Sequence, residues 1–324
     1  MAPQTSTEAW DTAWTLTMRT DRGRLTNQNF DKTNTLAWAR RMMMEMEEGG
    51  KEIKEDVEYD ETPAEWLAGH KELNVQEVDI ITAAFYRWRY VACPIVIAFD
   101  TEMEARKASG AIDVLTARSN NTMASIRNTV NATIWSAQTG LTMLGFQDII
   151  ADLPTTGTIG GINRATYSWW RNQYETTAIT ATTKTGDIFD LVRYMNSTWN
   201  TCSDGNEVPD VIFTTLAIYG AYQNLMSGTG YSRFEAKDPV KGIFNGNPSF
   251  NGAPVLYDRD IPASHMYFIN SQYTKLKVQT GVNFSKTPFR SPYNQLSKVA
   301  FIVFSCQLIC NQMRRNGVMT AITA

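Results

Sequence analysis

The sequence has few of the residues on which most active sites depend. It contains two histidines in 324 residues, His70 and His265, and neither lies in a His-Glu-x-x-His motif. No Gly-x-Ser-x-Gly motif is present, and Lys184-Thr185-Gly186, which matches a β-lactamase motif, has no accompanying Ser-x-x-Lys. We therefore expect no catalytic residue, and a soluble α+β hydrolase is the least favoured interpretation.

Cysteine is also scarce, and no cofactor site is predicted. The four cysteines, Cys93, Cys202, Cys306 and Cys310, lie in unrelated or apolar contexts and are predicted to be free and buried. In a strand, residues four apart are separated by about 13 Å, so Cys306 and Cys310 cannot share a metal ion. The glycine-rich stretch 155–164 lacks the Gly-Lys-Ser/Thr that completes a phosphate-binding loop.

Long apolar runs and an excess of basic residues are absent too. The most apolar stretch, Val299 to Cys310, is interrupted by Ser305 and Gln307 and is shorter than the ~18 residues of a membrane span. The first eight residues, MAPQTSTE, do not resemble a secretory signal, so we expect a protein made and used in cytosol. A net charge of −3 and a pI near 5.6 argue against tight non-specific binding of nucleic acid.

What is present includes one long predicted helix between Asp100 and Gly140. Asp100 can cap its start, Gly140 provides a left-handed stop, and Gly110 predicts a kink or break before a straight run over 111–136. One narrow face forms a buried stripe of Ala108, Leu115, Ser119, Met123, Ile126, Val130 and Ile134. The other flank is polar and is expected to face solvent or another copy of the chain; it comprises Asp113, Arg118, Asn120, Asn121, Arg127, Asn128 and Asn131.

The residues before this helix predict an arm and a short helix. Residues 1–34 have no sustained period but contain Trp10 and Trp14. Because each tryptophan gains a few kcal/mol from burial, we expect an extended arm that lies on another surface. A short helix is predicted over 35–48, ending at a glycine pair.

A two-legged hairpin is predicted next. Apolar and charged residues alternate over 51–59, and a second strand is predicted over 78–97, with an irregular tip between them. Such a hairpin is marginal alone, and its acidic leg and arginine-bearing leg can pair internally or contact a charged neighbour. Deletion of Glu52 to Arg87 is accordingly predicted to leave the subunit folded.

The remaining residues predict an α+β fold. The hydrophobic content of 43% is ample for two compact lobes. A loop is predicted over 141–154. Strands are predicted from about 167 to 183 and over 209–214, 250–257, 266–270, 274–278 and 299–310, and helices over 187–200 and 215–226.

Several short sequence segments, taken together and in this order, resemble those of a known protein family. They are Gly50-Lys51-Glu52-Ile53 with Tyr59, Tyr86-Arg87-Trp88, Gly160-Gly161-Ile162-Asn163-Arg164-Ala165, Trp169-Trp170-Arg171-Asn172-Gln173, Asn251-Gly252-Ala253-Pro254-Val255-Leu256-Tyr257-Asp258 and Arg314-Arg315-Asn316-Gly317-Val318. Over essentially its full length the sequence resembles the major capsid proteins of tailed bacteriophages, with the Hong Kong ninety-seven capsid fold. None of these phrases is catalytic, so the resemblance rests on their combination and order.

The resemblance implies a division of the chain and a role. It implies an N-terminal arm (1–48), an extended β-hairpin called the E-loop (49–93), a peripheral domain with a long spine helix (94–177 and 276–324) and an axial domain (178–275). It implies a major capsid protein that assembles into the hexamers and pentamers of an icosahedral shell around double-stranded DNA, in the virion, after assembly in the host bacterial cytoplasm. An encapsulin-like protein compartment is the alternative.

The implied partners are other copies of the chain, portal and scaffolding proteins, packaged DNA held by weak contacts and, as a further candidate, decoration proteins; no membrane partner is implied. A separate scaffold and a removed propeptide both remain open, and Lys51, Lys54 and Lys71 align with no cross-linking partner. The residues expected to touch neighbouring subunits are Trp10, Trp14, Glu55, Glu58, Tyr59, Trp66, Arg87, Trp88, Arg89, Arg118 and Arg127.

Overall fold

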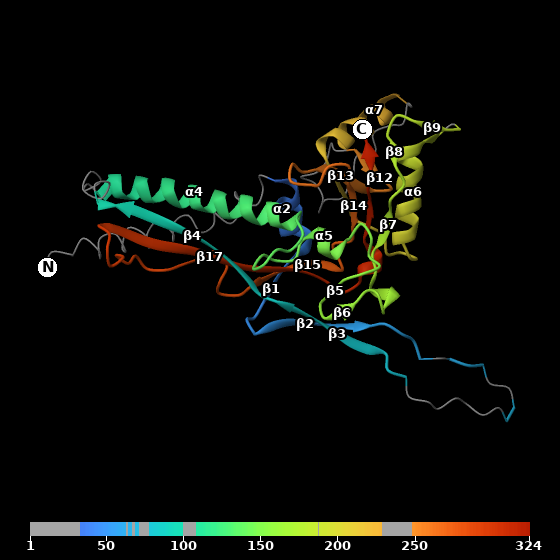
Figure 1. The fold of residues 1–324 in the computed structure, drawn as a ribbon, viewed down its shortest axis with the longest axis horizontal. Coiled ribbons are helices and arrows are strands. Elements are labelled where there is room, and N and C mark those ends of the chain that lie inside the picture. The colour runs from blue at the N-terminus through green and yellow to red at the C-terminus, as the bar shows by residue number, and fades with distance from the viewer. Residues whose placement is uncertain are drawn as a thin grey trace.

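The computed structural model describes residues 33–62, 64–66, 69–70, 78–99, 108–186, 188–228 and 248–324, with backbone only for 108–117 and 227–228. The molecule is elongated, with a tapering sheet and a long helix at one end, a lobe of sheet and helices at the other, and a projecting hairpin (Figure 1). The predicted arm, with Trp10 and Trp14, and the predicted start of the long helix at Asp100 lie outside the described residues.

A five-stranded sheet runs along the long helix. Its strands are β1 (Met44–Glu47), β15 (Thr274–Gln279), β17 (Ser297–Cys310), β16 (Ser285–Lys286) and β4 (Arg89–Ala98). Strand β17 is long enough to pair with β4 along its outer part and with β15 along its inner part, in both cases antiparallel. The β4–β17 ribbon lies beside helix α4 (Ala108–Ile134) in Figure 1.

Helix α4 confirms most of the predicted spine. The stripe residues whose side chains are described are buried, namely Ser119, Met123, Ile126, Val130 and Ile134. Two expectations were wrong. The helix is not broken at Gly110, because one glycine costs only about 1 kcal/mol; a kink there stays a prediction. Asn131, assigned to the polar flank, is fully buried because its amide meets two carboxylates described below.

A six-stranded sheet separates two hydrophobic cores. Its order is β12 (Ser249–Phe250), β13 (Ala253–Tyr257), β11 (Val211–Thr214), β14 (Met266–Ile269), β18 (Gly317–Met319) and β7 (Gln173–Glu175). Alternation along β11 sends Val211 and Phe213 to the core shared with α4, and Ile212 to a second core under α6 (Asp190–Cys202) and α7 (Leu216–Gly228). The sheet is therefore a shared wall, and both predicted lobes have a core of their own.

The N-terminal part of the chain differs from its prediction. Helix α2 (Asn34–Trp38) continues as one π-helical turn, η1 (Ala39–Met43), and the chain then becomes strand β1 rather than helix up to 48. The segment Met44-Glu45-Met46-Glu47 fits a helix by propensity, but it pairs in parallel with β15, so an available sheet edge overrides local preference.

The predicted strand over 78–97 is two strands. Strand β3 (Ile81–Arg87) pairs with β2 (Glu52–Glu58) to form the hairpin, whereas β4 pairs with β17. The chain changes sheets at Trp88, whose side chain is buried in the core that contains the α4 stripe. The second leg of the hairpin thus ends at Arg87.

Short helices, turns and strands fill the connections. The predicted loop over 141–154 contains a short helix, and the predicted strand over 167–183 is divided into a turn and short strands, so both predictions were partly wrong. The short elements are α5 (Phe146–Ile149), β5 (Thr158–Ile159), β6 (Ile162–Asn163), the 3-10 turns η2 (Ser168–Trp170) and η4 (Met313–Arg315), β8 (Ile179–Thr180), β9 (Lys184–Thr185), β10 (Ile188–Phe189) and β19 (Ile322–Thr323). The strands predicted over 209–214, 266–270, 274–278 and 299–310, and both later helices, are confirmed within a few residues.

Candidate assembly surfaces

The base of the hairpin, β2 with β3, is docked on the body of its own chain. Ile53 and Val57 of β2, and Ala84 and Tyr86 of β3, are buried in the same core as the stripe of α4. The Tyr86 hydroxyl donates a hydrogen bond of 2.6 Å to the Cys310 carbonyl, and burial raises the pKa of this phenol far above its ordinary value. The base therefore belongs to the subunit core, and the expectation that deletion of Glu52 to Arg87 leaves the subunit folded is replaced.

The glycine-rich stretch 155–164 packs against the hairpin. The Gly160 carbonyl accepts a 2.9 Å hydrogen bond from the Phe85 amide of β3. A Cβ at Gly160 would lie 2.9 Å from the Ala84 Cβ, and the backbone has φ of +61° there. Glycine is thus required for conformation and for close approach at this position. The neighbouring Arg164 is buried and donates to the Asp148 and Ile149 carbonyls at the end of α5.

Lys277 joins three segments at the hairpin base. Its Nζ lies 3.1 Å from a carboxylate oxygen of Glu45 and 3.2 Å from one of Glu47, both on β1, and 3.2 Å from Glu55 on β2. Lys277 itself is only 8% exposed. Burial opposes its charge, but the hydrogen bond to Glu45 and the charge of Glu55 raise its pKa overall. One lysine on β15 thereby ties the hairpin and the end of the arm to the central sheet.

Beyond Tyr59 the hairpin loses these supports. The Tyr59 ring stacks on Trp169 at 5.2 Å between centroids, the last aromatic contact before the tip, which we define as residues 60–80. All described residues of the tip are exposed or half-buried, and Trp66 is 98% exposed. An exposed tryptophan at the end of a projecting hairpin is a surface that another polypeptide can cover.

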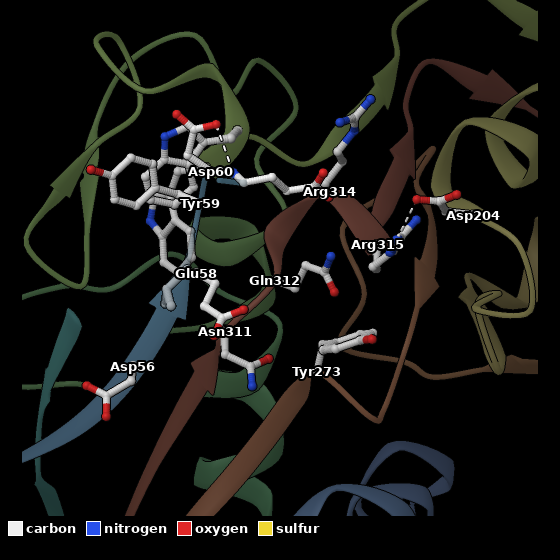
Figure 2. A pocket seen from close by; sticks show the side chains of 14 residues that line it. Asp56, Glu58, Tyr59, Asp60, Asp204, Tyr273, Asn311, Gln312, Arg314 and Arg315 are labelled. Atoms are coloured by element: carbon white, nitrogen blue, oxygen red, sulfur yellow. Dashed lines mark hydrogen bonds and ion pairs between the residues drawn. The ribbon is translucent and has the colours of Figure 1, made fainter. Parts of the chain in front are cut away.

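A polar pocket of about 600 Å³ lies between the hairpin and the body (Figure 2). Asp56, Glu58 and Asp60 line it from the hairpin side, whereas Arg314 and Arg315 face it from the segment around η4. Arg315 is held by ion pairs to residues 204 and 207, while Arg314 is exposed. The hairpin wall is acidic, whereas the body wall carries both signs of charge because Asp204 lies beside Arg315.

The polar flank of α4 carries two of the predicted contact residues. Arg118 donates a hydrogen bond to the Val96 carbonyl of β4, so it fastens the helix to the ribbon. Arg127 is half-buried, and its Nε and Nη1 have no hydrogen-bond partner among the described residues. Burial and the nearby charge of Arg259 lower the pKa of Arg127. Arg127 is thus a cation with unmet hydrogen-bonding capacity at the surface.

A buried network holds Thr35, close to the first described residue, against α4. Asp258 accepts from the Thr35 hydroxyl at 2.7 Å and from the Asn131 amide at 3.0 Å. The Trp135 indole donates to the Thr35 hydroxyl at 3.0 Å, and Asn131 also donates to Asp260 at 2.6 Å. Because Asp258 is 5% exposed, every partner of its carboxylate is needed to keep this charge satisfied.

The predicted contact residues thus have different surroundings. Glu58, Trp66 and Arg87 are exposed, although Arg87 also pairs with Glu52 across the hairpin at 3.2 Å; Tyr59, Glu55 and Arg89 are half-buried. Trp88 is 7% exposed and packs in the subunit core, so it presents almost no surface to a neighbouring subunit.

Sequence reasoning missed Lys277 and Asp258. Glu45 and Glu47 alternate with Met44 and Met46, as on one charged face of a strand. The predicted helix over 35–48 hides this signal, because these residues also have high helix propensity. Asp258 had no sequence signal beyond its place in a resembling phrase, because its partners Thr35 and Asn131 are remote in sequence.

Three of the cysteines are free and buried as predicted, and Cys93 is free but half-buried. Within the described part of the chain, no group of three or more His, Cys, Asp or Glu residues could hold a metal ion. No helix among the described residues is long and apolar enough to span a membrane.

Comparison with solved structures defines the class of fold. The chain has the fold of phage capsid proteins, an α+β architecture of the Hong Kong ninety-seven type. Neither protein-family models nor curated protein sequences give a match.

Three solved structures illustrate the likeness. The capsid subunit of cyanophage A-1(L) superposes with a TM-score of 0.67 and 16% identity, covering 92% of this chain and 95% of that one. The capsid of the native GTA particle gives a TM-score of 0.64 and 13% identity, over 88% and 90% of the two chains. The SrpI encapsulin of Synechococcus elongatus PCC 7942 gives 0.58 and 11%, over 87% and 86%. The resemblance found in the sequence phrases is confirmed at the level of the fold.

Proposed function

We propose that this chain is a major capsid protein, which self-assembles into an icosahedral shell around the double-stranded DNA of a tailed phage. The observation that carries the proposal is the near-complete superposition on capsid subunits, 92% of this chain on the cyanophage subunit. The projecting tip with Trp66 supports it, because a surface of this kind gains burial only when another polypeptide covers it.

In this proposal each region has a role. Residues 1–48 form the arm, the hairpin reaches a neighbouring subunit through its tip, the α4 lobe forms the periphery of a capsomer, and the lobe under the six-stranded sheet gathers at the axis of hexamers and pentamers. Glu58, Tyr59, Trp66, Arg87, Arg89, Arg118 and Arg127 are the described residues that we propose for contacts with neighbours, with Glu55 as a support of the hairpin.

The mildly acidic charge fits a container for DNA. A wall with strong affinity for each phosphate would hinder packaging and release, whereas weak, salt-screened contacts are sufficient to line it. Portal, scaffolding and decoration proteins are the further partners in this proposal, which places the protein in the virion after assembly in the bacterial cytoplasm.

A protein compartment of the encapsulin type is the second candidate. One observation favours it: the superposition on the SrpI encapsulin covers 87% of this chain. The same fold serves both roles, so the content of the particle distinguishes them.

Electron microscopy of the purified full-length chain tests the proposal, first alone and then co-expressed with the genes that neighbour its own. Regular icosahedral particles or capsomer rings are the expected result, and particles that enclose nuclease-protected DNA support the phage head. Particles that retain a co-purifying enzyme instead would favour the compartment. A monomer under every condition would contradict both.

A further inference from the structure

A small apolar groove lies beside the C-terminal half of α4. Its volume is about 250 Å³, and its apolar lining includes Val91, Val130, Leu141, Met143 and Cys306. Small-molecule sites usually occupy about 300–1,000 Å³, so this groove suits one or two large side chains better than a cofactor.

The rim of the groove is unusually apolar for an exposed surface. Leu141 is 84% exposed and Tyr90 is 59% exposed, and both line the groove. Their exposure next to an unfilled hollow indicates a surface that is covered in another state of the protein.

Arg89 contributes an unmet donor to the same groove. Its Nε is buried and has no hydrogen-bond partner among the described residues. A buried donor without an acceptor destabilises the structure, and more so when the group is charged. The occupant that fits this site therefore combines a large apolar side chain with a carboxylate.

The chain itself contains such a segment ahead of its first described residue, Thr33. In Glu8-Ala9-Trp10-Asp11-Thr12-Ala13-Trp14, two tryptophans stand beside two carboxylates. Trp10 or Trp14 can fill the groove, and Glu8 or Asp11 can accept from Arg89 and complement its charge.

The groove and the root of the arm lie on different faces of α4. The root is held at Asn131, whereas Thr133 lines the groove, and residues two apart on a helix point about 200° apart. To reach the groove of its own chain, the arm would have to pass around α4. Tyr90 and Leu141, which are exposed at the rim, leave the groove open to the arm of a neighbouring copy.

We infer that this groove receives the segment from Glu8 to Trp14 of a neighbouring copy of the chain, with a tryptophan in the hollow and a carboxylate on Arg89. The inference rests on the proposed function, because it requires subunits to lie side by side in a shell. It assigns the arm one defined binding site, the groove beside α4, rather than non-specific contact with neighbouring subunits.

Disulfide trapping in assembled full-length protein tests the inference. Copies with Ala13→Cys are co-assembled with copies with Leu141→Cys and are mildly oxidised at pH 8. Covalent dimers on a non-reducing gel are expected in at least about tenfold excess over a control pair, because a docked arm holds the two thiols at high effective concentration. The control replaces Leu141→Cys by Leu153→Cys, which is 61% exposed and outside the groove. The native Cys306 competes little, since burial raises the pKa of its thiol to about 12.

Two further variants make the test specific. Trp10→Ala with Trp14→Ala in the Ala13→Cys copy, and separately Arg89→Gln in the Leu141→Cys copy, should each lower the dimer yield severalfold. Particles that form normally but give no more dimer than the control would overturn the inference and leave the shell function intact. An Ala13→Cys/Leu141→Cys double variant that cross-links only within one chain would overturn it as well. Failure of the unmodified chain to assemble at all would instead overturn the proposed function.

Discussion

The base and the tip belong to the same hairpin, but they have different environments. At the base, side chains such as Ile53 and Tyr86 are almost wholly buried against the subunit. In the tip, residues 60–80, no described residue is buried, and Trp66 is 98% exposed. The subunit therefore secures the base with its own core and leaves the tip for contacts outside the chain.

This difference separates folding from assembly within one hairpin. Tyr59 marks the boundary, because its ring still stacks on Trp169 of the body. Substitutions before this boundary should change the free energy of unfolding, whereas substitutions beyond it should change only the association of subunits. The following predictions test the division, starting with the largest effect.

Ile53→Asp should prevent folding of the subunit. Ile53 is 0% exposed, and an unpaired carboxylate at this position costs several kcal/mol, a large part of the stability of a typical domain. Soluble yield and thermal unfolding measure the effect. Trp66→Asp is the matched control in the tip, and it should leave the unfolding temperature within about 2 °C of the original. A folded, cooperative Ile53→Asp protein would show that the base is not part of the core.

Lys277→Met should lower the free energy of unfolding by about 2–3 kcal/mol. The methionine keeps the length of the side chain, but Glu45, Glu47 and Glu55 lose their shared cation in a partly buried position. Urea denaturation gives the change.

Lys54→Met serves as the control for this cluster. Lys54 and Asp56, both on β2, form an ion pair at an exposed site. Loss of the Lys54 charge should therefore change the free energy of unfolding by less than about 0.5 kcal/mol. Equal effects of the two substitutions would show that the cluster around Lys277 does not hold the hairpin.

Tyr86→Phe should destabilise the subunit by about 1–2 kcal/mol, because the Cys310 carbonyl loses a 2.6 Å hydrogen bond in a buried site. Chemical denaturation measures this difference against Tyr90→Phe. Tyr90 is 59% exposed, so loss of its hydroxyl should have no measurable effect. If the Tyr86 substitution were equally neutral, the bond to Cys310 would not contribute to docking of the base.

The smallest expected effect concerns pH and the two histidines. His265 Nδ1 donates to the Ala263 carbonyl at 2.6 Å, so its Nε2 can donate to Asp152, 3.1 Å away, only in the imidazolium form. The hydrogen bond to Asp152 raises the pKa of His265, against the opposing effect of burial. Because the folded-state pKa is raised, the stabilisation is complete below the unfolded value of about 6.5 and is lost as pH rises through the folded-state pKa.

His265→Gln should therefore flatten the pH dependence of the urea midpoint between about pH 6 and 8, with a change below about 1 kcal/mol. His70→Gln, at an exposed position of the tip, should leave the profile unchanged. A profile that is the same in the original protein and in the His265 variant would show that this contact does not stabilise the fold.

Sequence periodicity predicted where helices and strands occur better than it predicted which elements pair with one another. The stripe of α4 and the alternation of β2 were predictable because each depends on residues close together in the chain. The switch to strand at Met44 and the change of sheets at Trp88 were not, because both depend on β15 and β17, more than 200 residues away. The network around Asp258 was hidden for the same reason, since remote residues supply its partners.

The division of the hairpin also corrects the deletion suggested by sequence alone. Removal of Glu52 to Arg87 would take Ile53, Val57 and Tyr86 out of the core and would leave Lys277 without Glu55. A sharper variant replaces Glu61 to Val78 by Asn-Gly, which closes the hairpin with a two-residue turn and retains Tyr59 on Trp169.

The most direct test of the account compares folding and assembly in that tip-replacement variant, using thermal unfolding and electron microscopy of the same preparation. We predict an unfolding temperature within a few degrees of the original and a loss of shells, because the subunit core is complete while the contact with the neighbour is missing. Shells of normal size, or a subunit that no longer folds, would contradict the claim that the base serves the subunit and the tip serves its neighbours.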